Sequence, residues 1–568
     1  MTKRLTGLLL CVCVLISCFT FGAIQTAAAD ASAKKTGADY GLPKNYLDGN
    51  ILHCFNWKYI DIKNELKSIA EAGFSAVQTS PAQEPDNNGK WYWLYQPKGF
   101  YMGNSSLGSK SDLQSLCTEA KKYGIQVIVD IVANHLTGDH GKIQDDLKDS
   151  KYWHNKGKCS NWNDRTQLTQ YNIGDYADLK TEDSYVQSVV KKYLNELKGI
   201  GVTGFRFDAA KHIATPAEGD NFFNMVKGVG VWSYGEILDN PGGNATSVMK
   251  EYTKYINVND CYYSGNITGN MRDKKVATKE SEWKEKGIDG SKLVYWGESH
   301  DTYSNNTDDG GWTKYLDQGV IDRSYAILAS RGDARALYLS RPQSTDRENI
   351  YAGSKGSTHY KSKEVAAVNH FKNALVGRKE KYTTGDGCDV VCREGGAVIA
   401  TANGSGGTKT VPNTGGLVKP GSYTDEVSGS KWTVTSTTMT GNVGSTGIAV
   451  FYSTAPYEEP TEAPTTQAPT TQAPTTQAPT TAQPTTEAPT VSKGIIGDAN
   501  LDNNVSIKDA TIIQKSIANL FTLSEDARLL CDVNSNGGIE IKDATCIQKY
   551  IAKMNGAGNA GRKYEEVN

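Results

Sequence analysis

The chain has 568 residues, which is enough for several domains, and its 61 basic and 63 acidic side chains give a formal net charge of −2. A near-neutral chain gives no reason to expect nucleic acid or another polyanion as a partner. The first segment, residues 1–29, has a basic start, an apolar run and small residues ending at Ala29. This pattern is typical of a secretory signal peptide and predicts a secreted, extracellular protein.

Two alternatives to plain secretion stay open. The apolar run from Gly7 to Ile24 approaches the roughly 18 residues at which a membrane-spanning helix becomes possible. The stretch Leu15–Cys18 also resembles a bacterial lipoprotein cleavage box, although the apolar run continues past the cysteine. No later segment has the composition of a membrane span, so no transmembrane segment is expected after signal cleavage.

Strand-like and helix-like segments alternate over the next part of the chain. The expected strands are residues 51–56, 75–80, 125–132, 204–208, 231–237, 293–298 and 335–340, and helical spacing is found in residues 62–72, 112–123 and 185–198. Such alternation indicates a parallel sheet with helices outside it. Over residues 45–380 it predicts an α/β fold, a (β/α)₈ TIM barrel, with a small inserted domain at residues 134–180 after the third strand.

Three further segments follow the expected barrel. Residues 381–455 contain short Val/Thr-rich runs separated by Gly, Asn and Ser, which predicts a small antiparallel β domain. Residues 456–493 are a Pro/Thr-rich linker without apolar periodicity. The cysteines outside the signal are dispersed and we expect free thiols for most of them; Cys388 and Cys392 would pair only if the chain bends between them.

The stretch GFRFDAAKH (204–212) places charged side chains on one face of a strand. Because side chains alternate along a strand, Phe205 and Phe207 share one face, while Arg206 and Asp208 share the other. Glu236 and Asp301 stand at the ends of later expected strands, where the active site of such a barrel lies. Two carboxyl groups in separate roles are what cleavage of a glycosidic bond requires. Taken alone, Arg206 and Asp208 are better explained as a structural ion pair.

Four ordered motifs resemble those of the α-amylase family, glycoside hydrolase family 13. They are DIVANH (130–135), GFRFDAAKH (204–212), YGEIL (234–238) and WGESHD (296–301). The resemblance implies that Asp208 is the catalytic nucleophile, Glu236 the general acid/base and Asp301 a third carboxylate that stabilises the transition state. The family retains anomeric configuration, so the Asp208 and Glu236 carboxyls are expected about 5–5.5 Å apart. Glu236 is expected to have a raised pKa.

The same resemblance implies a substrate-binding set. Tyrosine rings in the stretch WYWLYQP (91–97) suit sugars, because pyranose rings stack on aromatic faces and their hydroxyls seek polar edges. The residues expected to contact substrate are Tyr92, Tyr95, Gln96, His135, Arg206, Lys211, His212 and His300. A structural aromatic cluster is the alternative interpretation of residues 91–97.

Family members bind a structural calcium ion between barrel and insertion. The resemblance implies as ligands the side chains of Asn134 and Asp178 and the backbone carbonyls of Thr169 and His212. Asp164 and Asp175 remain alternatives. Some relatives bind chloride, and the sequence does not decide whether this chain does.

The C-terminal segment, residues 494–558, contains a duplication. Residues 497–518 recur as residues 531–552, and each copy is an EF-hand-like calcium loop followed by an apolar helix. The expected ligands of the two calcium ions are Asp498, Asn500, Asp502, Asn504 and Asp509 in the first loop and Asp532, Asn534, Asn536, Gly538 and Asp543 in the second. The second loop has fewer carboxylates, so weaker calcium binding is expected there.

A duplicated loop-helix unit after a Pro/Thr linker resembles a dockerin, the module that binds cohesin domains of scaffold proteins. By that resemblance, Ile507 and Lys508 in one copy and Ile541 and Lys542 in the other face the cohesin. Because the pairs are identical, we expect binding in two orientations.

These patterns together predict a secreted, endo-acting, retaining α-amylase that cleaves α-1,4-glucosidic bonds of starch and is held on a cohesin-bearing scaffold or cell surface. Its catalytic unit is expected to be monomeric. One alternative is an exo-acting maltogenic enzyme or transglycosylase of the same family. The other is a non-catalytic starch-binding protein, against which the presence of all three carboxylates argues.

Overall fold

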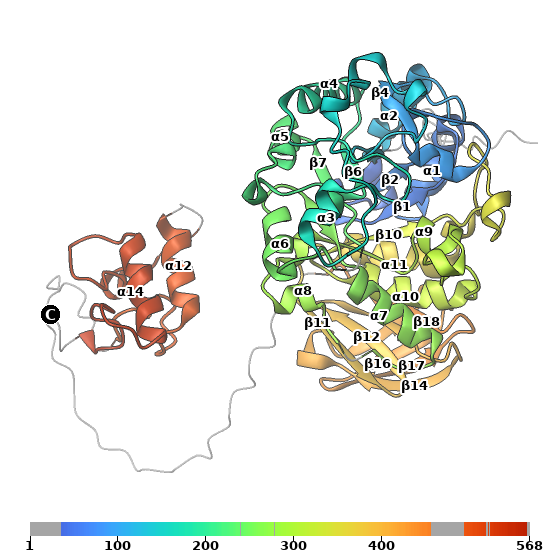
Figure 1. The fold of residues 1–568 in the computed structure, drawn as a ribbon. Helices are drawn as coiled ribbons and strands as arrows, with labels where there is room; N and C mark the ends of the chain where they lie inside the picture. The colour runs from blue at the N-terminus through green and yellow to red at the C-terminus, as the bar shows by residue number, and fades with distance from the viewer. Residues whose placement is uncertain are drawn as a thin grey trace, which may run out of the picture. The chain divides into compact units, whose positions relative to one another are not determined.

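The computed structural model describes residues 36–455 and 494–564, apart from residues 239, 278, 518–520 and 522. The signal segment 1–29 and the linker 456–493 therefore lie outside the described residues. The chain divides into two compact units, residues 1–460 and residues 461–568 (Figure 1). Each unit is described by itself below.

Eight parallel strands close into a barrel in the first unit. They are β1 (Ile51–Cys54), β2 (Ala76–Thr79), β5 (Gln126–Val132), β6 (Gly204–Asp208), β7 (Trp232–Gly235), β8 (Asn257–Asn259), β9 (Leu293–Trp296) and β10 (Arg335–Leu339). Each pairs with the next in this order, and β10 returns to β1. This confirms the predicted (β/α)₈ fold. The sequence analysis missed β8, which has three residues and one apolar side chain, Val258.

The helices surround this barrel (Figure 1). Their bounds are α1 Tyr59–Glu71, α2 Lys110–Tyr123, α3 Arg165–Gln170, α4 Ser184–Gly199, α5 Phe222–Val229, α6 Ala245–Tyr252, α7 Cys261–Arg272, α8 Glu282–Glu285, α9 His300–Ser304, α10 Gln318–Ser330 and α11 Lys363–Ala374. Local chemistry sets the ends of α2: Ser109 caps its N-terminus in a capping box with Asp112, and Gly124 ends it with φ of 69°. Val186, Val190 and Leu194 form the buried stripe that packs α4 onto the barrel.

The insertion after β5 is held together by short turns and α3. Single bridges link His135 to Asp178 and Trp153 to Leu179, so both ends of the insertion meet near the end of β5. A hairpin of β3 (Gln83–Pro85) and β4 (Pro97–Met102) flanks the same end of the barrel after β2.

An antiparallel β sandwich follows α11. One sheet has the order β11-β12-β13-β18 and the other β14-β17-β16-β15. Their bounds are β11 Glu380–Gly385, β12 Cys388–Arg393, β13 Gly396–Thr401, β14 Gly407–Pro412, β15 Gly421–Thr424, β16 Lys431–Val434, β17 Thr438–Val443 and β18 Ile448–Tyr452. Helix α10 lies between β10 and β13, which is why most of its length is buried. Cys388 and Cys392 share β12, and no disulfide joins cysteines within the described residues.

The second unit is a small helical module. Helices α12 (Ile507–Ile517) and α14 (Ile541–Ile551) have equal length and pack on each other, and α13 (Glu525–Cys531) lies between them in the sequence. Ala510 and Ile513 of α12 and Ala544 and Ile547 of α14 are buried at matching positions of the repeat. Within the described parts of both units, no helix combines the length and apolarity that crossing a membrane requires.

Candidate active site

Three carboxylates meet at the carboxyl end of the barrel. Asp208 is the last residue of β6, Glu236 directly follows β7, and Asp301 lies in α9, the short helix after β9. All three line one cleft of about 1060 Å³. The parallel strands account for this meeting, because their carboxyl ends open at the same face of the barrel.

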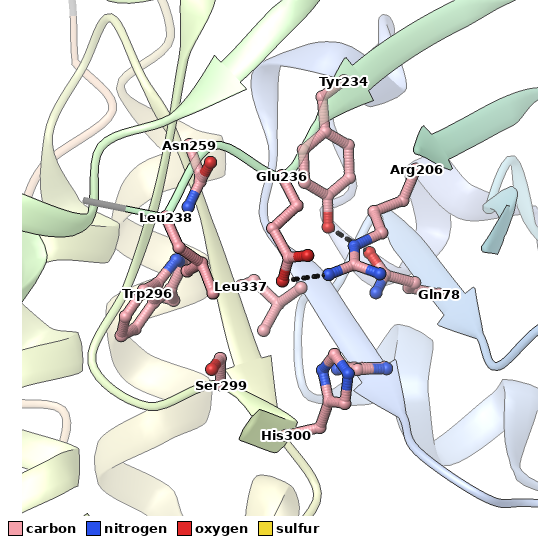
Figure 2. A pocket seen from close by; sticks show the side chains of 11 residues that line it. Gln78, Arg206, Tyr234, Glu236, Leu238, Asn259, Trp296, Ser299, His300 and Leu337 are labelled. Atoms are coloured by element: carbon pink, nitrogen blue, oxygen red, sulfur yellow. Dashed lines mark hydrogen bonds and ion pairs between the residues drawn. The ribbon is translucent and has the colours of Figure 1, made fainter. Parts of the chain in front are cut away.

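Arg206 links two of these carboxylates, Asp208 and Glu236, to each other and to Asp130. Its Nη1 is 2.8 Å from Asp208 Oδ1 and 2.9 Å from both carboxylate oxygens of Asp130 on β5, and its Nη2 forms an ion pair with Glu236 (Figure 2). On the opposite face of β6, the Phe207 ring packs 5.9 Å from that of Phe223 on α5. The predicted division of β6 into an apolar face and a charged face is confirmed.

Burial dominates the electrostatics of this cluster. It raises the pKa of Asp208 and of Glu236, and it raises that of Asp130 to about 6, while the Arg206 guanidinium opposes each rise. The charge of Asp301 raises the Glu236 pKa further, in the expected direction. One guanidinium thus faces several buried carboxyls, and an arrangement of this kind retains a proton on a carboxyl at higher pH than in water.

A small cavity of about 30 Å³ lies below the cleft, lined by His53, Arg206 and His300 among others (Figure 2). The His300 ring stacks on Tyr95 with centroids 5.0 Å apart. Burial lowers the pKa of His300 to about 3, so its ring is neutral at physiological pH. Arg206 and His300 thus line this small cavity and not the cleft, although both were expected to contact substrate.

The cleft itself brings together most of the expected substrate-binding residues. Those on its wall are Tyr92, Tyr95, Gln96, His135, Lys211 and His212. His135 Nε2 lies 3.1 Å from the Tyr95 carbonyl oxygen, and its ring stacks on Tyr176 at 5.2 Å. Burial lowers the pKa of His135 to about 4 and that of His212 to about 3. Both imidazoles are thus uncharged and able to donate or accept a hydrogen bond.

The sequence analysis missed several cleft residues. Trp162, Tyr176, Tyr262, Trp312 and Arg347 also line the cleft. Most of them lie on irregular loops, where no periodicity indicates which way a side chain points. Trp162 stands edge-on to His212 at 5.7 Å and is 48% exposed. Composition was the available signal, since aromatic side chains outside regular elements suit the binding of a carbohydrate.

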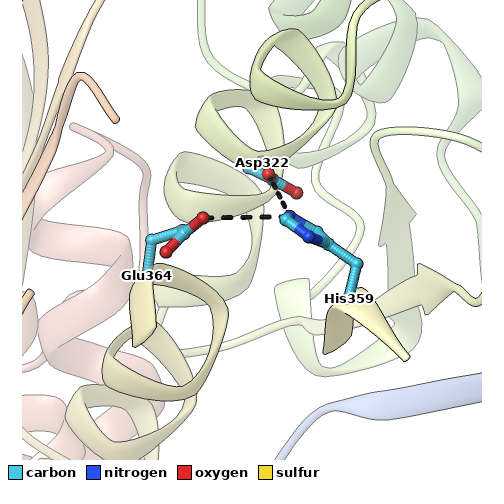
Figure 3. A group of neighbouring side chains, drawn as sticks. All are labelled: Asp322, His359 and Glu364. Carbon is cyan, nitrogen blue, oxygen red and sulfur yellow. Dashed lines mark hydrogen bonds and ion pairs between the residues drawn. The ribbon is translucent and has the colours of Figure 1, made fainter. Parts of the chain in front are cut away.

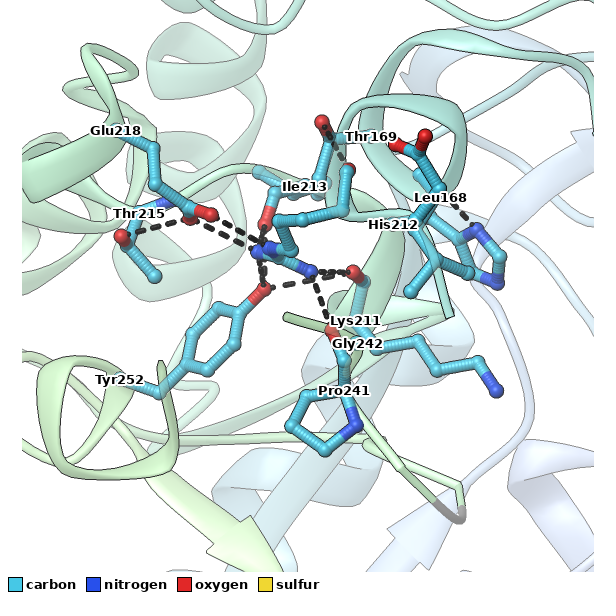
Figure 4. A network of polar contacts seen from close by, with 12 residues as sticks. Leu168, Thr169, Lys211, His212, Ile213, Thr215, Glu218, Pro241, Gly242 and Tyr252 are labelled. Atoms are coloured by element: carbon cyan, nitrogen blue, oxygen red, sulfur yellow. Dashed lines mark hydrogen bonds and ion pairs between the residues drawn. The ribbon is translucent and has the colours of Figure 1, made fainter. Parts of the chain in front are cut away.

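Arg165 of α3 connects the insertion to the active-site wall and was also missed. Its guanidinium donates to both carboxylate oxygens of Glu218, at 2.7 and 3.0 Å, and to the backbone carbonyls of Lys211, Ile213 and Pro241 (Figure 4). It also contacts the Tyr252 hydroxyl. One partly buried side chain therefore holds the loop after β6, which carries Lys211 and His212, against α3.

The expected calcium ligands lie in two pairs. Asn134 Nδ2 donates to Asp178 Oδ1 at 3.0 Å, and both side chains are buried. His212 Nδ1 lies 2.8 Å from the carbonyl oxygen of Leu168, which places His212 beside Thr169. Burial raises the pKa of Asp178 to about 7, and His154, 2.5 Å away, counters the rise. A buried carboxylate beside a side-chain amide group supplies oxygen atoms of the kind that Ca²⁺ prefers as ligands.

The two alternative ligands are engaged elsewhere. Asp164 caps the N-terminus of α3 by accepting from the Gln167 amide at 3.1 Å. Asp175 is exposed and pairs with Lys158 at 2.6 Å. Neither carboxylate faces Asp178 in these contacts.

The two loops of the helical module repeat one hydrogen-bond pattern. Asp498 accepts from the Asp502 amide and Asp532 from the Asn536 amide, each at 3.0 Å. The buried Asp509 and Asp543 accept loop amides in the same way. Each loop thus folds back onto the carboxylates at its first and last expected ligand positions, and the two copies do so alike, as expected of a duplicated calcium loop.

Ile507 and Ile541 begin α12 and α14 and are 57% and 56% exposed, so the module presents the same apolar side chain twice. The neighbouring Lys508 and Lys542 are exposed as well. Exposed isoleucines in pairs are typical of a binding surface, because isoleucine is usually buried.

Comparison with known proteins agrees with these features. Residues 43–318 match the family described as alpha amylase, catalytic domain, and residues 496–552 match the dockerin type I domain. An alpha-amylase of Clostridium acetobutylicum is 35% identical over 439 residues, which cover 72% of this chain and 55% of that protein. An alpha-amylase of Butyrivibrio fibrisolvens is 31% identical over 468 residues, which cover 71% and 47%. The chain thus spans about half the length of these two relatives.

Among solved structures, a mutant of alpha-amylase I from Eisenia fetida in complex with maltohexaose has a TM-score of 0.57 and 20% identity. The match covers 71% of this chain and 97% of that chain. At this identity the likeness establishes the shared fold.

Proposed function

The chain carries an alpha-amylase catalytic domain, of glycoside hydrolase family 13, and a type I dockerin domain, and on that premise we propose that it is an endo-acting, retaining α-amylase of starch and related α-1,4-glucans. The observation that carries this proposal is the link formed by Arg206 between Asp208 and Glu236, at the floor of a large open cleft. A glucan chain is the natural occupant of a cleft with aromatic walls and acidic groups at its base.

Asp208 acts as nucleophile and Glu236 as general acid and then base. Glu236 protonates the glycosidic oxygen while an Asp208 oxygen attacks the anomeric carbon, forming a covalent glycosyl ester and releasing the leaving-group sugar. Glu236 then removes a proton from water, which displaces Asp208 and restores the original configuration. The raised pKa of Glu236 supports its role as the proton donor.

The remaining site residues bind and orient the sugar. Asp301, 3.4 Å from His300 Nε2, accepts sugar hydroxyls and stabilises the positive charge of the transition state. The neutral His135 and His300 donate to hydroxyls without repelling that charge. Tyr92, Tyr95 and Gln96 hold the ring that becomes covalently attached, and Lys211 and His212 contact the leaving-group side.

A calcium ion bound by Asn134, Asp178 and the carbonyls of Thr169 and His212 would stabilise the site. It would supply a rigid positive link between the insertion and the loop after β6. Arg165 already joins these two segments, so the calcium ion and the Arg165 guanidinium would both stabilise the contact between the insertion and the loop after β6.

The dockerin domain attaches the enzyme to a cohesin domain of a scaffold protein. Ile507 and Lys508 form one binding face and Ile541 and Lys542 the other, and both are exposed. Changing Ile507 and Lys508 to alanine should preserve cohesin binding, whereas changing all four residues should abolish it. Loss of all binding in the first variant would refute two-orientation binding.

Attachment to such a scaffold requires export, and residues 1–29 would serve as the signal. Mass spectrometry of the mature N-terminus tests this, since cleavage after Ala29 and lipidation at Cys18 give different masses.

The decisive assay is hydrolysis of soluble starch and of a blocked maltoheptaoside. Rapid loss of viscosity with α-configured oligosaccharides supports endo action with retention. A single small product, or an intact blocked substrate, would instead support the exo-acting or transglycosylating alternative. Asp208→Asn is the control, because full activity in that variant would overturn the nucleophile assignment. No activity in the unaltered protein would favour the non-catalytic alternative, which a starch-binding assay would then test.

A further inference from the structure

A second cluster of metal-binding side chains lies outside the cleft lining. Asp322 belongs to α10, His359 begins the short 3-10 helix His359–Lys361, and Glu364 lies in the first turn of α11. His359 Nε2 is 2.8 Å from Asp322 Oδ2 and 3.8 Å from Glu364 Oε1 (Figure 3). One ligand atom from each residue lies within 4.8 Å of the other two. Three different structural elements thus converge on one point.

We propose that Asp322, His359 and Glu364 bind a divalent transition-metal ion of the Zn²⁺ type. Ligand atoms held about 2.0–2.1 Å from a tetrahedral Zn²⁺ lie about 3.3 Å apart, and the separations of His359 Nε2 from the two carboxylates, 2.8 and 3.8 Å, fall on either side of this value. An imidazole nitrogen with two carboxylates suits Zn²⁺ and related ions, whereas Ca²⁺ and Mg²⁺ prefer oxygen ligands alone. This site is therefore chemically distinct from the calcium sites proposed above.

The surroundings of Asp322 support a metal ligand. Its Oδ1 accepts hydrogen bonds from the Tyr338 hydroxyl at 2.7 Å and from Gln318 Nε2 at 3.1 Å, which directs Oδ2 toward His359. Such outer partners orient metal ligands in known sites. The neighbouring Arg341 is paired with Glu298 at 2.8 Å, so its charge is compensated.

The cluster of Asp322, His359 and Glu364 is partly open to solvent, so an ion could bind there with a water molecule. The Asp322 and Glu364 side chains are 5% and 13% exposed, while that of His359 is 35% exposed. Three protein ligands with one open side match sites in which water completes the coordination.

The metal would secure a loop that reaches the cleft. Residues 340–362 connect β10 to α11, and His359 lies near the end of this connection. In its middle, the Arg347 guanidinium lies 4.7 Å from the centre of the Tyr92 ring at the cleft wall. A metal ion that links His359 to α10 and α11 would fix the end of this loop that leads into α11. We therefore expect metal binding to raise thermal stability without a role in the chemistry.

Titration of the full-length protein with Zn²⁺, in the presence of saturating Ca²⁺, tests the proposal. Calorimetry should detect one Zn²⁺ ion per chain that excess Ca²⁺ does not displace, and Co²⁺ should give a visible absorption band at the same site. His359→Asn should weaken Zn²⁺ binding by more than about 100-fold, the upper end for changes in outer partners of a metal. Glu364→Gln, which keeps the side-chain size, should also weaken binding and serves if His359→Asn does not fold.

His370→Asn is the matched control. His370 forms a similar histidine–carboxylate pair, with Nδ1 2.6 Å from Glu426 Oε1, and it is absent from the three-residue cluster. The His370→Asn variant should bind Zn²⁺ as tightly as the unaltered protein does. A protonated His359 that merely bridges two carboxylates would bind no Zn²⁺. Three results would each overturn the proposal: no Zn²⁺ binding by the unaltered protein, displacement of Zn²⁺ by Ca²⁺, or equal Zn²⁺ binding by His359→Asn.

Discussion

Replacing Arg165 by methionine removes the link between the insertion and the active-site wall while keeping a side chain of similar length. The change breaks the two hydrogen bonds to Glu218 and leaves the backbone carbonyls of Ile213 and Pro241 without this donor. Asp208 at the end of β6 and Glu236 just after β7 should keep their positions, because both pair with Arg206, whereas Arg165 bonds to Glu218, Tyr252 and backbone carbonyls. The loop after β6 should therefore loosen while the carboxylates remain in place.

The expected loss of stability is about 3 kcal/mol in the free energy of unfolding. Breaking a buried ion pair costs about 3–5 kcal/mol. The Glu218 side chain is 27% exposed, so the lower end of that range applies. Arg165→Lys should recover part of the loss, since lysine keeps the charge but not the fork of donors.

Urea unfolding of the catalytic unit, calcium affinity and KM for maltooligosaccharides check this expectation. Arg165→Met should lower calcium affinity and raise KM more than it lowers kcat, because Lys211 and His212 lie on the loosened loop. Arg272→Met is the control: Arg272 pairs with Asp273 at the surface, and its loss should cost less than about 1 kcal/mol. Wild-type stability, calcium affinity and KM in Arg165→Met would refute the reasoning.

Three other expectations concern separate parts of the chain. Trp162→Ala should raise KM about ten-fold with little change in stability, since an aromatic contact is worth about 0.5–1.5 kcal/mol and the ring is half exposed; an unchanged KM would exclude a sugar contact there. Burial lowers the pKa of Lys372 to about 7, so the unfolded chain binds an extra proton above that pH. Stability should then rise from pH 7 to about 10 by at most about 1.4 kcal/mol per pH unit, and Lys372→Met should flatten this rise in urea titrations. In residues 494–564 produced alone, calorimetry should give weaker calcium binding for the loop of Asp532 than for the loop of Asp498. Equal affinities would contradict the prediction made from the number of carboxylates in each loop.

Sequence patterns that extend over a few residues were sufficient to predict much of the fold and of the candidate site. The alternation along β6 assigned Arg206 and Asp208 to one face, because side chains of a strand alternate regardless of what surrounds it. The duplicated loops and helices of the C-terminal module were visible as a repeat, and the structure confirms it with α12 and α14. Strand β8 escaped prediction because three residues carry too little periodicity to be distinguished from a loop.

The sequence by itself indicated the alternation of strands and helices, placed Asp208 and Glu236 at the ends of strands and Asp301 just after one, and predicted a barrel, a β domain and a dockerin. Only the tertiary structure decided which distant residues meet: Asp130 with Arg206, Arg165 with the loop after β6, and Asp322 with His359 and Glu364. The physical reason is the range of the interactions. Backbone geometry and hydrophobic periodicity act over a few residues, whereas these polar contacts exist because the barrel closes and brings together loops far apart in the chain.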